Sequence, residues 1–264
     1  MSPRKRRAYI LILPSLFTTG NLFCGFYSII SSFNHDFERA AYAIIFAGIF
    51  DVLDGRVARI TRSTSQFGLE YDSIADVVSF GVAPAILSYV WVLQGYGRLG
   101  WAAAFLFAAC GALRLARFNT ITDEAPKSYF VGLPIPAAAN FIAASVIAQR
   151  DLQVLPPGPA VLVVVFGLGL LMVSTVRYRT FKDFDLRHRR SFFILVASVV
   201  VLTVVVARPE QALLAIFGYY VVWGPVREAI SWMRRALFSK DRSPLKHDLA
   251  SATLPQGEEP RETR

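Results

Sequence analysis

The chain has 264 residues, of which 54% are hydrophobic, and a formal net charge of +9. Its mean hydropathy is +0.44, and several apolar runs reach the roughly 20 helical residues that cross a bilayer core, which excludes an ordinary soluble globule. The basic residues stand in short blocks between these runs, a pattern typical of membrane topology signals rather than of a nucleic-acid-binding surface, so we expect no nucleic acid partner.

Eight apolar runs predict eight transmembrane helices, because in lipid each backbone polar group must find its partner within its own segment. The predicted helices cover residues 9–33, 38–57, 70–93, 99–118, 130–149, 159–176, 191–207 and 211–233. We therefore expect an all-α integral membrane protein. Its three parts are a basic cytoplasmic N-terminus at 1–8, a membrane domain at 9–233 and a polar cytoplasmic tail at 234–264. The tail has too few large apolar residues to order itself, so we expect it to be disordered.

The distribution of Lys and Arg predicts how these helices are oriented. If the N-terminus lies in the cytoplasm, the inner segments carry 24 of the 28 basic residues. Cytoplasmic segments of membrane proteins are enriched in Lys and Arg, so both termini are expected on the cytoplasmic side. We expect the protein in a bacterial cytoplasmic (inner) membrane, with its active site facing the cytoplasm.

Four aspartates stand where the second and third predicted helices meet the cytoplasm. Asp51 and Asp54 lie at the inner end of the second helix, and Asp72 and Asp76 at the inner start of the third. At spacings of three and four residues, each pair shares one helix face. An ionised Asp at the centre of an inserted helix costs roughly 2.5 to 3.5 kcal/mol, so these carboxylates need metal ions or an aqueous cavity nearby. The short connection predicts that the two pairs meet around one centre.

Carboxylates grouped in this way suit hard divalent ions. All-oxygen ligation favours magnesium, manganese or calcium, and two such ions would balance four negative charges. A pair of ions about 4 Å apart clamps phosphoryl oxygens during in-line displacement. Gly55 would let a substrate approach the backbone, and Arg59 could form charge-assisted bonds with a phosphate. The alternative is a charged surface hairpin in which Arg56, Arg59 and Arg62 pair with the carboxylates.

The acidic motif resembles the signature of the CDP-alcohol phosphatidyltransferases, integral membrane enzymes that make phospholipids. The matching positions are Asp51, Asp54, Gly55, Ala58, Arg59, Gly68, Asp72 and Asp76. The resemblance implies a CDP-linked diacyl lipid as donor and an alcohol that displaces CMP. It further implies two divalent ions, Mg2+ or Mn2+, held by the four aspartates. Asp76 would also be the catalytic base that takes the proton of the acceptor hydroxyl. A homodimer is expected from the same resemblance.

Longer stretches resemble the phosphatidylserine synthases within this family. They are residues 13–25, 67–73, 79–84, 114–119 and 132–136. The resemblance implies CDP-diacylglycerol and L-serine as substrates, and phosphatidylserine and CMP as products. Membrane lipids would surround the protein.

The resemblance also implies which residues bind the CDP-lipid. Gly55, Ala58, Arg59 and Gly68 belong to the motif and would line the CDP part of the donor. Asn21 lies within the first predicted helix. Its amide would hydrogen-bond the nucleotide or satisfy a neighbouring helix, and the sequence does not separate the two.

Serine carries a carboxylate, which a guanidinium binds through two parallel hydrogen bonds. Arg114 and Arg117, at the inner end of the fourth predicted helix, are the first candidates for this contact. Arg177 and Arg179 are the second. The alternative for all four is a topology signal or contact with anionic lipid headgroups.

Two other functions are compatible with parts of the sequence. The same chemistry could use another acceptor, such as glycerol phosphate, inositol or inositol phosphate. A divalent-cation transporter could also use intramembrane carboxylates. The clustering of the acidic residues at one membrane edge, with Gly55 and Arg59 beside them, favours phosphate chemistry over a conduction path.

Overall fold

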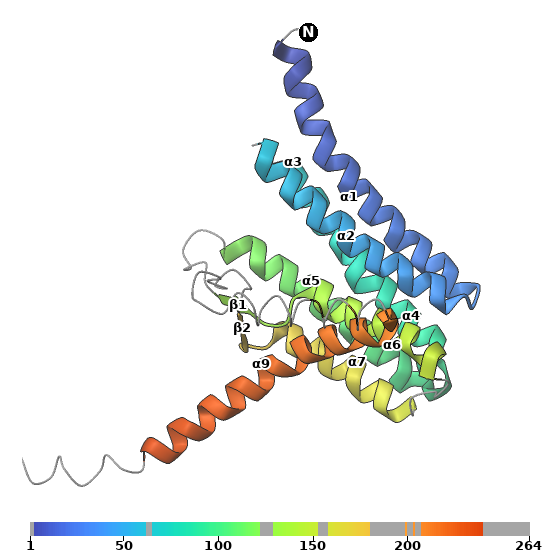
Figure 1. Cartoon of the computed structure of the whole chain (residues 1–264), viewed down its shortest axis with the longest axis vertical. Coiled ribbons are helices and arrows are strands. Elements are labelled where there is room, and N and C mark those ends of the chain that lie inside the picture. The colour runs from blue at the N-terminus through green and yellow to red at the C-terminus, as the bar shows by residue number, and fades with distance from the viewer. Residues whose placement is uncertain are drawn as a thin grey trace, which may run out of the picture. The chain divides into compact units, whose positions relative to one another are not determined.

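The computed structural model describes residues 3–61, 65–121, 129–152, 158–179 and 207–239, together with positions 199 and 203 (Figure 1). Its elements in chain order are α1 (Pro3–Phe33), α2 (Phe37–Thr61), α3 (Gln66–Asp76), the π-helical turn η1 (Val77–Val82), α4 (Ala83–Trp91), the 3-10 turn η2 (Leu93–Tyr96), α5 (Gly97–Ile121), β1 (Tyr129–Val131), α6 (Ile135–Leu152), α7 (Gly158–Val173), β2 (Arg177–Arg179) and α9 (Pro209–Ser239). The described part is thus almost entirely helical. The predicted seventh span, apart from positions 199, 203 and 207, and the tail beyond Ser239 lie outside the described residues.

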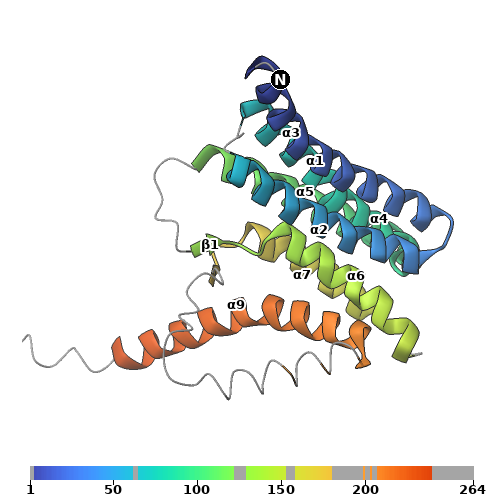
Figure 2. The ribbon, with the colours of Figure 1, turned by 45° about the horizontal axis from the view of Figure 1, so that its top comes forward.

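α1 and α2 form an antiparallel pair that lies side by side (Figure 1 and Figure 2). The chain reverses between them at His35, which takes the left-handed conformation with φ 59°. Small side chains of α2 are buried: Ala40, Ala41, Ala43 and Ala47. Small residues let two backbones approach closely, which compensates in lipid for the absence of a hydrophobic driving force between helices.

The third predicted span is a run of three helical pieces, α3, η1 and α4. In η1 the backbone N–H of Ala83 donates to the carbonyl of Val78, five residues earlier. Pro84 follows at the start of α4 and has no N–H to give to the helix ladder, which favours a change of pattern at this point. Single π-helical turns inside α-helices are frequent at functional sites, and this one begins directly after Asp76.

The predicted all-α class is confirmed for the described residues, with two short strands in addition to the helices. β1 pairs with β2 in antiparallel register, with Phe130 opposite Tyr178. The predicted start of the fifth span at residue 130 is therefore wrong, because α6 begins only at Ile135. Gly132 explains the later start: it has φ 80°, and a β-carbon there would lie 2.3 Å from the carbonyl oxygen of Met172 in α7. Pro134 then precedes the helix.

The chain divides into two compact units, residues 1–224 and 225–264. The boundary falls inside α9 at Pro225, which cannot donate a backbone hydrogen bond. The described part of the second unit is the remainder of α9, to Ser239. All the residues of the site described below belong to the first unit.

Three helical stretches are long and apolar enough to cross a membrane, counting only the described residues. They are Gln66–Trp91, Leu93–Thr120 and Pro209–Ser231. α7 is a shorter apolar helix. The protein is accordingly a membrane protein, and the number of spans, eight, remains a prediction.

Candidate active site

Three of the four motif aspartates converge. Asp51 comes from α2, and Asp72 and Asp76 come from α3. Each offers a carboxylate oxygen, and these oxygens all lie within 4.8 Å of one another. The two helices therefore bring their acidic ends to one centre.

Asp54 borders this group. It is buried, with 5% of its surface exposed, and its Oδ2 atom accepts a hydrogen bond of 3.1 Å from the Thr18 hydroxyl of α1. Its side chain is also close enough to Asp72 to interact directly. A fourth carboxylate thus stands beside the three that converge.

Local sequence explains why the acidic residues of α3 point to this centre. Ser65 caps the N-terminus of α3, and its Oγ atom accepts a 3.0 Å hydrogen bond from the Gly68 N–H. This bond fixes where the helix begins, and hence which face carries Asp72 and Asp76 four residues apart. Gly68 therefore has a structural role at the helix cap, in addition to the role in donor binding that the family resemblance implies.

The residues fit a hard metal ion. The Oδ1 atom of Asp72 is buried and has no hydrogen-bond partner among the described residues. Uncompensated carboxylates this close repel one another, and a buried acceptor without a partner costs free energy. A hard cation with oxygen ligands would relieve both. The acidic cluster is therefore a candidate metal site.

The motif residues next to Asp54 leave the backbone accessible. A β-carbon on Gly55 would have only the Arg59 Nη2 atom within reach, at 4.0 Å. The Nε atom of Arg59 donates to the Gly55 carbonyl at 2.8 Å, so this exposed guanidinium is held along α2 beside the glycine. Ala58 is half-buried. A ligand could therefore reach the α2 backbone at Gly55 with a cation next to it.

Asn21 is fully buried in α1, with 0% of its surface exposed. Its Nδ2 atom donates to Asp76 at 3.0 Å, and its backbone carbonyl accepts a 2.9 Å bond from the Ser79 hydroxyl. Sequence reasoning had named Asn21 and missed Thr18. The available signal was a polar residue three positions before Asn21, on the same face of an apolar helix.

The four arginines considered for serine binding differ in their surroundings. Arg114 of α5 is 9% exposed, and its Nε atom is buried without a hydrogen-bond partner in the described part of the chain. It is close enough to Asp76 to interact electrostatically. Arg117 is exposed on the same helix. Arg177 and Arg179 lie in β2, where their backbones pair with β1. Of the four, Arg114 has an electrostatic interaction with the acidic centre, whereas the side chains of Arg177 and Arg179 lie outside the described part of the structure.

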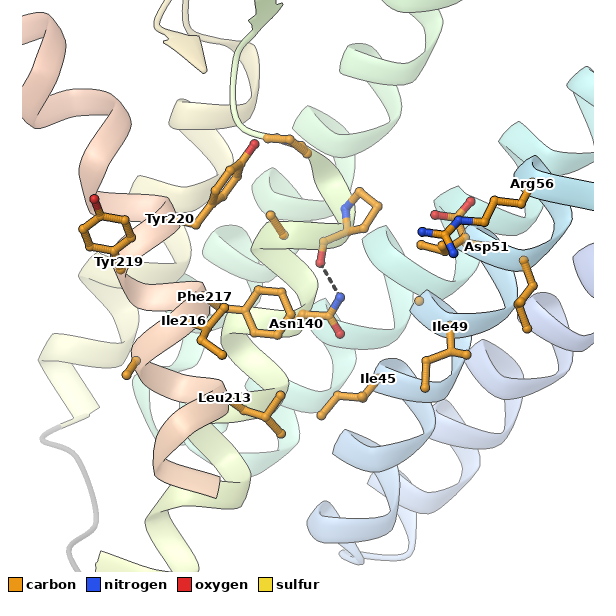
Figure 3. Close-up of a pocket in the computed structure, with 17 residues that line it drawn as sticks. Ile45, Ile49, Asp51, Arg56, Asn140, Leu213, Ile216, Phe217, Tyr219 and Tyr220 are labelled. Atoms are coloured by element: carbon orange, nitrogen blue, oxygen red, sulfur yellow. Dashed lines mark hydrogen bonds between the residues drawn. The ribbon is translucent and has the colours of Figure 1, made fainter. Parts of the chain in front are cut away.

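A cavity of about 1040 Å³ opens beside Asp51 (Figure 3). α2 contributes Ile45 and Ile49, and α9 contributes Leu213 and Ile216 on the opposite wall. The remaining labelled lining residues are Arg56, Asn140, Phe217, Tyr219 and Tyr220. The cavity is therefore largely apolar, with a carboxylate of the acidic cluster on its wall. Sequence patterns gave no sign of it, because its walls come from helices far apart in the chain.

Comparison with known proteins agrees with the geometry. The CDP-alcohol phosphatidyltransferase profile matches residues 11–176. The chain belongs to the CDP-alcohol phosphatidyltransferase family. The family predicted from the motif is thereby confirmed, and the matched region includes all four aspartates.

Individual members of the family extend the similarity over most of the chain. A protein of Helicobacter pylori (strain J99) is 40% identical over 236 residues, which cover 89% of this chain and 98% of the relative. A Bacillus subtilis protein is 36% identical over 171 residues, covering 64% of this chain and 91% of the relative. A Methanocaldococcus jannaschii protein is 35% identical over 194 residues, which cover 71% of this chain and 83% of the relative. All three are named CDP-diacylglycerol–serine O-phosphatidyltransferase.

Proposed function

We propose that this chain is an enzyme that transfers a phosphatidyl group from CDP-diacylglycerol to L-serine, giving phosphatidylserine and CMP. The observation that carries the proposal is the convergence of Asp51, Asp72 and Asp76. It occurs in a chain whose similarity to a protein named for this reaction covers 89% of its length. No feature of the described residues favours a transporter or another acceptor.

The four aspartates are proposed to hold two divalent ions, Mg2+ or Mn2+. Bound there, such ions would neutralise the diphosphate of the donor and polarise the phosphorus under attack. Asp76 also accepts the proton of the serine hydroxyl, which is a weak nucleophile until it loses that proton. The serine oxygen forms a new bond to the phosphorus of the phosphatidyl group. The bond from this phosphorus to the bridging oxygen of the diphosphate breaks, and CMP leaves with its electrons.

The donor is held where α2 is accessible. Arg59 binds the diphosphate through charge-assisted hydrogen bonds, and Gly55 lets the donor lie against the backbone. Ala58 and Gly68 complete this surface. The apolar cavity next to Asp51 suits an acyl chain of the same lipid, because its lining offers few polar groups.

The acceptor site is assigned to Arg114. A buried guanidinium with an unpaired Nε atom is costly, and the serine carboxylate would satisfy it. The closeness of Arg114 to Asp76 would place the serine hydroxyl near its base. Arg117 is the second choice, and Arg177 and Arg179 follow.

The proposal includes a location. Eight spans with both termini in the cytoplasm would put the acidic centre at the cytoplasmic edge of a bacterial inner membrane, where soluble serine arrives and CMP departs. A homodimer is proposed from family membership alone.

An acceptor panel tests the function. Purified protein in detergent, given CDP-diacylglycerol and Mn2+ or Mg2+, should release CMP with L-serine and not with glycerol 3-phosphate, inositol or inositol phosphate. Chelation with EDTA should stop the release, and added Mn2+ should restore it. Release of CMP with glycerol 3-phosphate but not with serine would reject the acceptor assignment. Metal uptake into protein-containing liposomes without any CMP release would instead support a transporter.

A further inference from the structure

α1 carries no acidic motif residue, yet two of its side chains bind motif aspartates. The Thr18 hydroxyl donates to Asp54 at 3.1 Å and shares its one hydrogen with the Pro14 carbonyl of its own helix at 3.2 Å. Asn21 donates to Asp76 at 3.0 Å. Both donors are buried, Thr18 with 4% and Asn21 with 0% of its surface exposed. Hydrogen bonds to carboxylates in a buried setting are stronger than those between neutral groups at a surface.

These two contacts link elements that are separate in the chain. Thr18 and Asn21 are three residues apart and so lie on one face of α1. Asp54 belongs to α2, whereas Asp76 ends α3. A single helix face therefore binds one carboxylate from each of the helices that form the acidic centre.

The position of Asn21 is itself fixed from η1. The Ser79 hydroxyl donates to the Asn21 carbonyl at 2.9 Å, and Ser79 is fully buried. Ser79 stands three residues after Asp76, within the π-helical turn. Asn21 is thus hydrogen-bonded both to Asp76 and to Ser79 of the π-helical turn. A shift of α1 or of this turn would therefore disturb the Asp76 carboxylate.

We infer that Thr18 and Asn21 are positioning residues, which hold Asp54 and Asp76 in the orientation that binds the metal ions. This inference rests on the metal site of the proposed function. It differs from that proposal because both residues act through carboxylates and need no contact with substrate. Groups that orient metal ligands typically change metal affinity or activity by roughly 10- to 100-fold when they are removed.

Thr18→Val tests the inference, because valine keeps the shape of threonine and removes the hydroxyl. The readout is Mn2+ binding to the purified protein without substrate, followed by electron paramagnetic resonance. We expect the dissociation constant for Mn2+ to rise roughly tenfold or more in Thr18→Val. Thr18→Ser keeps a hydroxyl at this position, and its dissociation constant for Mn2+ should stay within about twofold of the parent value.

Thr19→Val is the matched control. Thr19 neighbours Thr18 in the same helix, but it is exposed and its hydroxyl contacts Ser15 and Tyr71 instead of an aspartate. The Mn2+ affinity of the Thr19→Val protein should therefore remain within about twofold of the parent value. Equal Mn2+ affinities for Thr18→Val and Thr19→Val would overturn the inference for Thr18.

A double-mutant cycle shows whether Thr18 acts through Asp54. If it does, Thr18→Val should have little further effect on Mn2+ binding in an Asp54→Ala background, which removes the acceptor oxygen of the shared contact. Additive effects would contradict the inference. Asn21→Leu provides an independent arm that keeps Thr18 intact, and gel filtration of each variant reports whether it folds. Unchanged Mn2+ affinity in folded Asn21→Leu would remove Asn21 from the positioning role.

The measurement also separates this inference from the proposed function. Mn2+ binding without substrate does not depend on which alcohol the enzyme accepts. A protein that fails the acceptor panel but shows the expected Thr18 dependence would keep the positioning inference and lose the serine assignment. In active protein, Thr18→Val should raise the Mn2+ concentration needed for half-maximal activity and leave the KM for serine within about twofold.

Discussion

Gly25 of α1 lies directly against Ser79 of η1. A β-carbon on residue 25 would lie 2.3 Å from the Ser79 Oγ atom and 2.7 Å from its Cα atom, so no larger side chain fits without a shift of the backbone. The two elements are therefore in closer contact than any pair of ordinary side chains would allow. This contact stands one helical turn beyond the Asn21 bond to Asp76.

Gly25→Ala should destabilise the protein, because the added methyl group must push η1 away from α1. We expect a loss of roughly 1 to 3 kcal/mol in the free energy of unfolding, typical of overpacking. Thermal unfolding in detergent measures it. Gly167→Ala is the control, since a β-carbon at that helical position would meet nothing within 4 Å. Similar melting temperatures for the two variants would contradict the close contact.

Asp54→Asn should remove most activity and leave the fold intact. The change keeps the volume of the side chain but deletes a charge that the proposed metal site requires, and loss of a ligand should lower kcat by roughly 100-fold or more. Release of CMP with serine measures it. Glu70→Gln makes the same chemical change at an exposed position of α3. It should retain full activity, and equal losses in both variants would argue against a special role for Asp54.

Arg114→Lys should weaken serine binding selectively. Lysine keeps the positive charge but cannot make the paired hydrogen bonds of a guanidinium, so the KM for serine should rise roughly tenfold or more. The KM for CDP-diacylglycerol should stay within about twofold. Arg39→Lys, at an exposed ion pair with Asp36, is the control. An unchanged serine KM in Arg114→Lys would exclude Arg114 from the acceptor site.

Ala137→Phe should change which donors the enzyme accepts. Ala137 lines the cavity beside Asp51, and a phenyl ring there would reduce the room for an acyl chain. The KM for donors with long chains should rise at least roughly fivefold, since each buried methylene contributes about 0.8 kcal/mol. Donors with short chains should be less affected. Val163→Phe, at an exposed position of α7, is the control, and parallel changes in both variants would reject the cavity as a chain site.

The acidic centre could be predicted from the sequence, because residues three or four apart in a helix lie on the same face. Once Asp51 and Asp76 are assigned to helices joined by a short connection, their approach follows from helix geometry. The spacing of the motif also indicated the family, which the comparisons confirmed. The start of the third span, predicted at residue 70, lies within a few residues of the observed start of α3 at Gln66.

Features that depend on tertiary contacts could not be predicted. The spacing of Thr18 and Asn21 indicates that they share a face of an apolar helix, but it does not indicate that Thr18 contacts Asp54, which lies in another helix. The strands β1 and β2 contain three residues each, too few for an alternating pattern. The cavity also depends on where α9 packs, and its Tyr220 is distant in sequence from the motif.

The π-helical turn sets a rotational phase between the two halves of the third span. Each residue of an α-helix advances the side chain by roughly 100° around the axis, so a one-residue deletion in the α-helical part of the span, within α4, would rotate Asp76 away from its partners if the end of α4 stayed in place. Within Val77–Val82 the wider i→i+5 turn already holds the extra residue that such a deletion would remove. Insertions and deletions in this span are therefore restricted more strongly than substitutions of equal hydrophobicity. The orientation of a reactive carboxylate is thereby encoded in the length of a segment as well as in its composition.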